Sequence, residues 1–120
     1  RGRSVEEYRT QFAGLLERAI GFAQGRRERV LVLSIPDWGA TPYARGLARD
    51  TQQVAHEIDA FNAVALQACL RRGVVYVDIT EVSRRHGGEA QMLVDDGLHP
   101  SSLMYAAWTR LALPAVQAIP

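Results

Sequence analysis

Hydrophobic residues near the start of the chain recur at helical spacing. The apolar positions, three and four residues apart, are Val5, Tyr8, Phe12, Leu15, Leu16, Ala19 and Ile20. Ser4 has the short hydroxyl side chain that caps helix N-termini, and Glu6 and Glu7 place negative charge in the first turn. The pattern predicts a helix that begins after Ser4 and ends between Gly21 and Gly25.

The next apolar segment lacks helical spacing. Residues 30–35 read Val-Leu-Val-Leu-Ser-Ile, a nearly uninterrupted apolar run with β-branched residues. Such a run predicts a strand buried on both faces of a parallel sheet. Turn-forming residues 36–42 follow, and loops at strand ends are where ligands meet open α/β sheets. Trp38 lies in this loop and is a candidate substrate contact, with an aromatic lid over the core edge as the alternative.

A second helix and a second strand follow. Asp50 or Thr51 can cap a helix that stops at Gly73. Its apolar positions are Val54, Ile58, Phe61, Ala65, Ala68 and Cys69. Residues 74–78 then predict a short buried strand, and residues 79–88 an exposed connection.

A last helix completes an alternating pattern. Ser101 can cap this helix, which Pro114 is expected to break or kink. Its apolar positions are Met104, Tyr105, Trp108, Leu111 and Leu113. The alternation of helices and strands is typical of a doubly wound α/β fold. However, two parallel strands make a sheet that is too narrow to be covered by helices on both faces. We therefore expect these residues to be part of a larger α/β sheet.

Composition places the chain among ordinary globular proteins. Its 120 residues are 48% hydrophobic and 22% charged, which excludes intrinsic disorder and fits a single domain with a core. The formal net charge is +1, too little for a typical nucleic-acid partner. All 14 cationic residues are arginines scattered along the sequence, and we assign them no function. No apolar run approaches the length of a membrane span.

The reactive side chains concentrate in residues 95–101, Asp-Asp-Gly-Leu-His-Pro-Ser. The carboxylate of Asp96, three residues before His99, can accept a hydrogen bond from one imidazole nitrogen and hold the ring in one tautomer. The other nitrogen can then take a proton from a hydroxyl nucleophile or from water. Asp96 and His99 are therefore candidates for a general-base pair, although the same spacing also occurs where an aspartate only caps a turn.

The residues around this pair resemble a known family. Asp96-Gly97-Leu98-His99-Pro100-Ser101, followed by the helix with Tyr105, Ala106 and Trp108, closely resembles the last conserved block of the SGNH hydrolases, also called the GDSL esterase/lipase family. Residues 30–38 resemble the family's penultimate core strand with its loop, and residues 74–80 its final strand. The resemblance covers essentially the whole chain, but only the C-terminal half or so of the family's domain.

The resemblance implies a three-layer α/β/α, flavodoxin-like fold and a serine hydrolase that acts on small-molecule esters without a cofactor. Asp96 and His99 map onto the acid and base of the catalytic triad, and the family's spacing favours Asp96 over Asp95. The family's serine lies in an N-terminal Gly-Asp-Ser motif, and its oxyanion hole uses a glycine amide and an asparagine. These motifs are absent here, and Asn62 and the serines at positions 4, 34, 83, 101 and 102 lie in other contexts.

We therefore expect residues 1–120 to be the C-terminal part of a single SGNH hydrolase domain. A missing N-terminal segment or a companion chain would carry the serine, and a start at Arg1 in place of methionine agrees with this expectation.

Two other interpretations stay open. Asp37, Asp95, Asp96 and His99 could hold a divalent metal ion in a metallohydrolase, because carboxylates and imidazole suit such ions. Alternatively, the chain is a non-catalytic, flavodoxin-like binding module in which the Asp-His pair only pins a turn.

Overall fold

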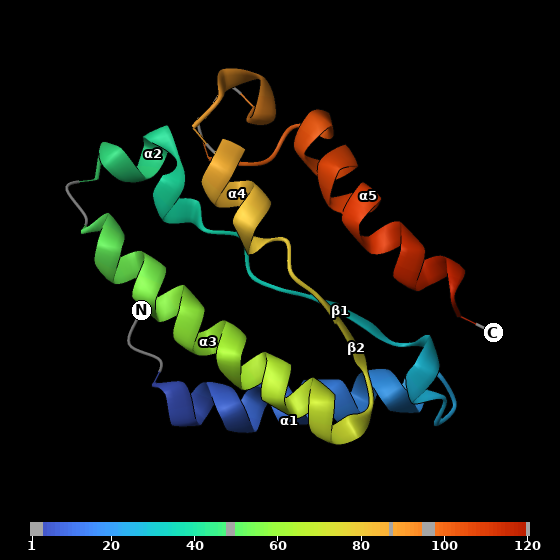
Figure 1. Cartoon of the computed structure of the whole chain (residues 1–120). Coiled ribbons are helices and arrows are strands. Elements are labelled where there is room, and N and C mark those ends of the chain that lie inside the picture. Colours follow the sequence, from blue (N-terminus) through green and yellow to red (C-terminus); the bar gives the residue numbers. More distant parts are fainter. Residues whose placement is uncertain (1–3, 48–49, 87, 95–97, 120) are drawn as a thin grey trace.

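Two short parallel strands form the centre of the fold, with helices on both of their faces (Figure 1). The structure is a computed structural model that describes residues 4–47, 50–86, 88–94 and 98–119. Its elements, in chain order, are α1 (Val5–Phe22), the 3₁₀ helix η1 (Arg27–Arg29), β1 (Leu31–Leu33), the 3₁₀ helix η2 (Trp38–Ala40), α2 (Pro42–Arg45), α3 (Thr51–Arg72), β2 (Val75–Val77), α4 (Thr80–His86), the 3₁₀ helix η3 (Ala90–Met92) and α5 (Ser102–Gln117).

Capping residues set the bounds of the two long helices α1 and α3. The Ser4 hydroxyl accepts a hydrogen bond from the Glu7 N–H (3.0 Å), and the Glu7 carboxylate accepts one from the Ser4 N–H (2.9 Å). The Asp50 carboxylate accepts hydrogen bonds from two N–H groups of the first turn of α3, at 3.0 and 3.2 Å. Gly73 ends α3 with a φ of +70°, a conformation that glycine adopts without strain. The predicted starts and ends of both helices are confirmed.

β1 and β2 pair in parallel, with Leu31 opposite Val75 and Leu33 opposite Val77. The parallel pairing confirms the prediction. Each strand is only three residues long, however, and Leu33 and Val75 are 43% and 44% exposed. The prediction that residues 30–35 form a strand buried on both faces is therefore wrong, because α5 covers only part of one face of this narrow sheet.

Two hydrophobic clusters hold the layers together. The first, between the sheet and the helices α1 and α3, consists of Leu16, Ile20, Ala68, Cys69 and Val74. The second, between the sheet and α5, consists of Ile79, Met104 and Trp108. Met104 and Trp108 lie one turn apart and supply the contact of α5 with the core, whereas the other predicted apolar positions, Tyr105, Leu111 and Leu113, are exposed. Burying each large apolar side chain contributes about 1.5–3 kcal/mol to stability.

Residues 79–88 contain the helix α4 and not the exposed connection that was predicted. Ile79 is 2% exposed, and Thr80 and Ser83 are each 4% exposed. The Ser83 hydroxyl donates to the Thr80 carbonyl (2.6 Å) and accepts from the Asp37 N–H (2.8 Å). Backbone partners thus allow polar side chains to occupy the buried side of α4, and hydrophobic periodicity cannot reveal such a helix.

α5 continues through Pro114 and ends at Gln117, so the proline lies near the end of the helix but does not break it at its own position. The proline lies in the last turn, where its missing N–H removes one hydrogen bond near the helix end. The N–H of Ala118 donates to the Pro114 carbonyl at 3.1 Å and closes that turn.

Within the described ranges, no helix has both the length and the apolar character needed to cross a bilayer.

Replacing Gly73 with alanine is expected to lower the free energy of unfolding by about 1–2 kcal/mol, because a residue with a Cβ is strained in the left-handed region. The new Cβ would also lie 2.8 Å from Nε of Arg27. Gly14→Ala is the matched control: it lies inside α1 with nothing within 4 Å of the added Cβ. This change is expected to raise the free energy of unfolding by about 0.5–1 kcal/mol. Urea unfolding measures both, and equal effects would contradict the assigned backbone at Gly73.

Candidate functional site

The carboxyl ends of β1 and β2 meet in a buried polar junction. The Ser34 N–H donates to the Val77 carbonyl at 3.0 Å and extends the sheet by one bond. The Ser34 hydroxyl donates to Oδ1 of Asp78 (3.1 Å) and accepts from the N–H groups of Ile79 (2.8 Å) and Thr80 (3.1 Å). Ser34 and Thr80 are each 4% exposed. The Ser34 hydroxyl, which lies within an apolar segment of the sequence, therefore connects the ends of the two strands through hydrogen bonds.

Asn62, in the middle of α3, completes this junction. Its Oδ1 accepts from the Ile35 N–H (2.9 Å), and its Nδ2 donates to Oγ1 of Thr80 (2.9 Å). Its backbone carbonyl accepts from the Tyr76 hydroxyl (3.3 Å). One side chain thus connects α3 to the exits of both strands. Sequence reasoning gave Asn62 no role. The sequence signal for a polar junction at this place was Asp78, a carboxylate at the end of a predicted strand.

Asp37, in the loop after β1, is a buried carboxylate that is 5% exposed. Its Oδ1 accepts from the Gly39 N–H (2.9 Å), and its Oδ2 pairs with Nε of Arg84 (2.8 Å). Arg84 also donates to Oδ1 of Asp59 at 2.9 Å. The hydrogen bond that Arg84 donates to Asp37 raises the pKa of the Arg84 guanidinium above its ordinary value.

These contacts bear on the metal interpretation. Both carboxylate oxygens of Asp37 have hydrogen-bond partners, the Gly39 N–H and the Arg84 guanidinium. Among the described residues, no group of three or more His, Cys, Asp and Glu side chains is placed to hold a metal ion.

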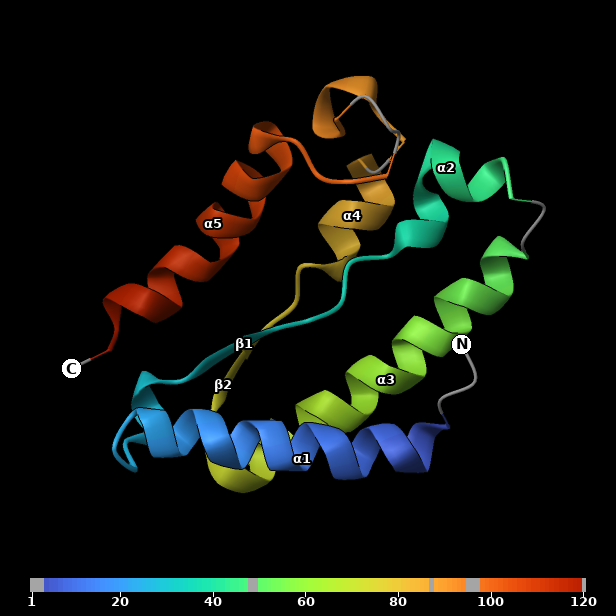
Figure 2. The same cartoon turned by 180° about the vertical axis from the view of Figure 1, so that it is seen from behind.

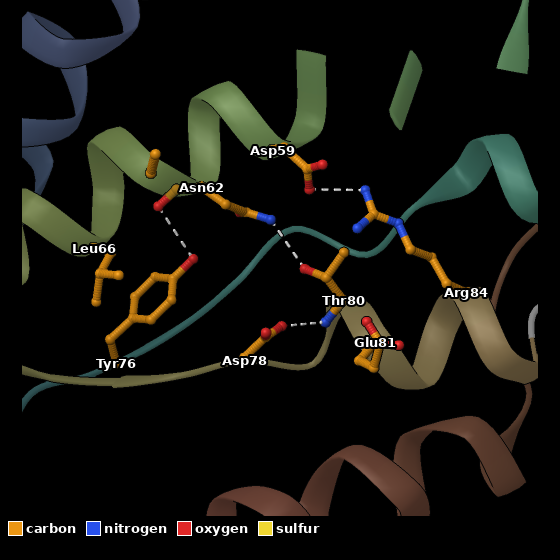
Figure 3. A pocket seen from close by; sticks show the side chains of 9 residues that line it. Asp59, Asn62, Leu66, Tyr76, Asp78, Thr80, Glu81 and Arg84 are labelled. Atoms are coloured by element: carbon orange, nitrogen blue, oxygen red, sulfur yellow. Dashed lines mark hydrogen bonds and ion pairs between the residues drawn. The ribbon is translucent and has the colours of Figure 1, made fainter. Parts of the chain in front are cut away.

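A pocket of about 190 Å³ opens beside the junction, between α3 and the segment that leaves β2 (Figure 3). It is lined by Asp59, Asn62, Ala63, Leu66, Tyr76, Asp78, Thr80, Glu81 and Arg84. Ligands of open α/β sheets bind at the carboxyl ends of the strands, where this pocket lies. Its lining contains no serine, cysteine or histidine, so it can bind a polar group but provides neither a nucleophile nor an imidazole base.

His99 is exposed and lies in the segment that precedes α5. An isolated antiparallel bridge pairs Leu93 with Pro100, and the Val94 N–H donates to the His99 carbonyl at 2.9 Å. The backbone at the predicted base and directly after it is therefore held by hydrogen bonds. Asp95 and Asp96 lie outside the described residues.

Ser101 attaches this loop to the helices on either side. Its N–H donates to the Met92 carbonyl (2.9 Å), and its hydroxyl donates to the Gln91 carbonyl (2.7 Å). The same hydroxyl accepts from the Met104 N–H (3.4 Å) and caps α5, as its sequence position predicted. Two residues after His99, the chain is thus fixed to both η3 and α5.

The segments that carry the predicted site residues Trp38 and His99 lie toward the same end of the molecule. The loop before α5, drawn in orange, lies beyond α4 on the side where the strands exit, and α2 lies on that side too (Figures 1 and 2). Trp38 is half-buried, and its carbonyl accepts from the Thr41 N–H (3.1 Å) and hydroxyl (2.6 Å). This arrangement leaves Trp38 as a candidate substrate contact.

The serines that the structure describes cap helices, form buried hydrogen bonds or lie exposed at a helix start. Ser34 and Ser83 are buried and hydrogen-bonded, and Ser4 and Ser101 cap helices. Ser102 is the exposed first residue of α5. None of them lies in a Gly-Asp-Ser motif.

Comparison with known proteins gives one match. A family model described as the GDSL-like Lipase/Acylhydrolase family matches residues 1–107. The matched range contains both strands, the polar junction, the loop with His99 and the start of α5. No match was found among curated proteins or among solved structures.

Replacing Asn62 with alanine is expected to lower the free energy of unfolding by about 2–3 kcal/mol, because the Ile35 N–H loses its acceptor and Thr80 loses a donor. Gln67→Ala on the same helix is the control. Gln67 is exposed and makes one long hydrogen bond, of 3.5 Å, to Arg9. Its removal is expected to cost less than about 0.5 kcal/mol. Similar losses for the two variants in urea unfolding would show that the junction contributes little.

Stability is expected to depend on the ionisation of Tyr76 in alkali. Burial raises the pKa of the Tyr76 hydroxyl from 10.0 to about 12, and the neighbouring Asp78 adds to the rise. The folded state therefore holds this proton more tightly than the unfolded state, so the contribution is complete below pH 10.0 and is lost as the pH rises to about 12. The chain has no lysine, which leaves few other groups to titrate in this window.

The measurement is urea unfolding at several pH values across this window. Tyr76→Phe is expected to reduce the alkaline loss of stability, whereas Tyr105→Phe, at a position that is 53% exposed, should leave it unchanged. An equal alkaline loss in the wild-type protein and in Tyr76→Phe would contradict the assignment.

Proposed function

The chain belongs to the GDSL-like lipase/acylhydrolase family, and from this premise we propose that it acts as a serine ester hydrolase with an acyl-enzyme mechanism. His99 is the general base of this reaction, and Asp96 is the acid that orients it. The substrate is a small-molecule ester, and Trp38 contacts it. The nucleophilic serine and the oxyanion-hole donors lie outside residues 1–120, on a preceding segment or a companion chain.

The reaction proceeds in two steps. In the first, the imidazole of His99 takes the proton of the serine hydroxyl while the serine oxygen attacks the ester carbonyl carbon. The resulting imidazolium gives this proton to the departing alcohol oxygen, and the acyl-enzyme remains. In the second step, His99 takes a proton from water as the water oxygen attacks the acyl carbon. The imidazolium then gives this proton to the serine oxygen as the acyl–serine bond breaks, which releases the carboxylic acid and restores the serine hydroxyl. Asp96 stabilises the imidazolium in both steps.

One observation carries this proposal. Within the range that the family model matches, the backbone bonds around His99 and Ser101 present an exposed imidazole on the side where the parallel strands end. A general base needs such fixation, because it must lie within hydrogen-bond reach of the proton that it removes. The exposure of His99 leaves room for a serine and a substrate to approach.

We further propose that residues 1–120 form the C-terminal part of one three-layer, flavodoxin-like domain. The described sheet supports this proposal, since two strands are fewer than such a layer requires. Leu33 and Val75 leave apolar surface open on the face toward α5, where further strands and helices would cover it. The isolated chain is expected to be inert because it lacks the nucleophile.

The test uses the complete protein that contains this chain. His99→Ala is expected to lower kcat/KM for an aryl ester by about 10⁴-fold or more, and to slow labelling by a fluorophosphonate, because the serine loses its base. His56→Ala is the matched control, at an exposed position on α3. Circular dichroism checks that both variants are folded. Activity retained in His99→Ala would overturn the assignment.

The same assay distinguishes the two aspartates. Asp96→Asn is expected to lower kcat by about 10⁴-fold, whereas Asp95→Asn should have little effect. The reverse order would assign the acid to Asp95. Absence of a fluorophosphonate-labelled serine in the complete, active protein would exclude the serine mechanism altogether.

A further inference from the structure

Arginines from two distant parts of the sequence converge at one end of the molecule. Arg26, Arg27 and Arg29 lie in the connector around η1, and Arg71 and Arg72 form the end of α3. All five side chains are exposed, and we call this group the basic end. The C-terminal parts of α1 and α3 come together at this end, away from the loop that precedes α5 (Figures 1 and 2).

Direct contacts bring the two segments of the basic end together. A Cβ added at Gly73 would lie 2.8 Å from Nε of Arg27, so the Arg27 side chain rests against the end of α3. Arg72 donates from Nη2 to Oε1 of Glu17 on α1 at 3.1 Å. These contacts follow from the packing of α1 on α3 in the first hydrophobic cluster.

The charge of this end differs from that of the whole chain. Glu28 is the acidic residue in its two segments, and Glu17 of α1 pairs with Arg72, against the five arginines, whereas the full sequence has a net charge of only +1. Among the described residues, Arg26, Arg27 and Arg71 have no acidic partner. The C-terminal dipole of α3 accounts for cations in its last turn, but it does not account for the arginines of the connector.

Apolar side chains accompany these charges. Phe22 at the end of α1 is 86% exposed, and Leu70 beside Arg71 is 70% exposed. They are the two most exposed large hydrophobic residues in the part of the chain that the structure describes. Holding a phenylalanine and a leucine in water next to several cations is unfavourable unless another surface covers them.

We propose that the basic end docks on the surface of an anionic phospholipid bilayer. The arginines pair with the negative head groups, and Phe22 and Leu70 enter the boundary between head groups and acyl chains. Charge complementarity is common to lipid and nucleic acid, but a leucine has no aromatic face for base stacking, so the exposed Leu70 beside Arg71 favours lipid. The basic end lies opposite the His99 loop, and this inference does not depend on the proposed catalysis (Figure 1).

The test measures binding of the complete protein that contains this chain to sedimented vesicles. We expect binding to vesicles of phosphatidylserine and phosphatidylcholine, little binding to phosphatidylcholine alone, and a loss of affinity as salt is added. R26Q/R71Q is expected to lower affinity for the anionic vesicles about fivefold for each arginine removed. R85Q/R110Q, which removes the same charge at exposed positions on α4 and α5, should leave affinity unchanged.

The aromatic contact is tested separately. Phe22→Ala is expected to lower affinity for anionic vesicles about tenfold. Leu111→Ala, at a position on α5 that is 44% exposed, should have no effect. A competing single-stranded oligonucleotide tests the alternative partner: tighter binding to the oligonucleotide, unchanged in Phe22→Ala, would assign the basic end to nucleic acid.

Equal binding to neutral vesicles, or an equal loss of affinity in R26Q/R71Q and R85Q/R110Q, would overturn the proposal. Since all the substituted side chains are exposed, circular dichroism should show unchanged helix content in every variant.

Discussion

The structure depends on the hydrogen bonds that Ser34 makes where β1 and β2 end. A two-stranded parallel sheet with three residues in each strand has little cohesion of its own. The Ser34 hydroxyl adds bonds to Asp78, Ile79 and Thr80, and the Asn62 side chain ties the same point to α3. Buried polar groups that are fully satisfied in this way specify one arrangement, because any displacement leaves donors and acceptors unpaired at considerable cost.

This junction also sets the position of the functional surface. Ser83 and Arg84 of α4 bind the Asp37 loop, so α4 and the loop with Trp38 form one connected unit after the strand exits. The loop with His99 is fixed independently by its own bridge and by Ser101. In the proposed function, these hydrogen bonds would hold His99 in place as the base of a hydrolase of the family to which the chain belongs.

The two ends of the sheet have different surface chemistry. At the carboxyl ends of the strands lie carboxylates and a polar pocket, and the segment before α5 that contains His99 lies on the same side (Figure 1). At the other end, the connector after α1 and the end of α3 present arginines with exposed Phe22 and Leu70. In the proposed arrangement, a protein attached through the basic end would direct the His99 loop away from the bilayer, where soluble esters can reach it.

Local interactions explain what the sequence by itself determined. Caps at Ser4, Asp50 and Ser101 and the αL stop at Gly73 act within a few residues, so helix bounds could be predicted, and the resemblance of the His99 block to its family is confirmed. Only the tertiary structure decided the rest. α4, the role of Asn62 and the basic end depend on partners tens of residues away, and hydrophobic periodicity carries no information about such polar pairings.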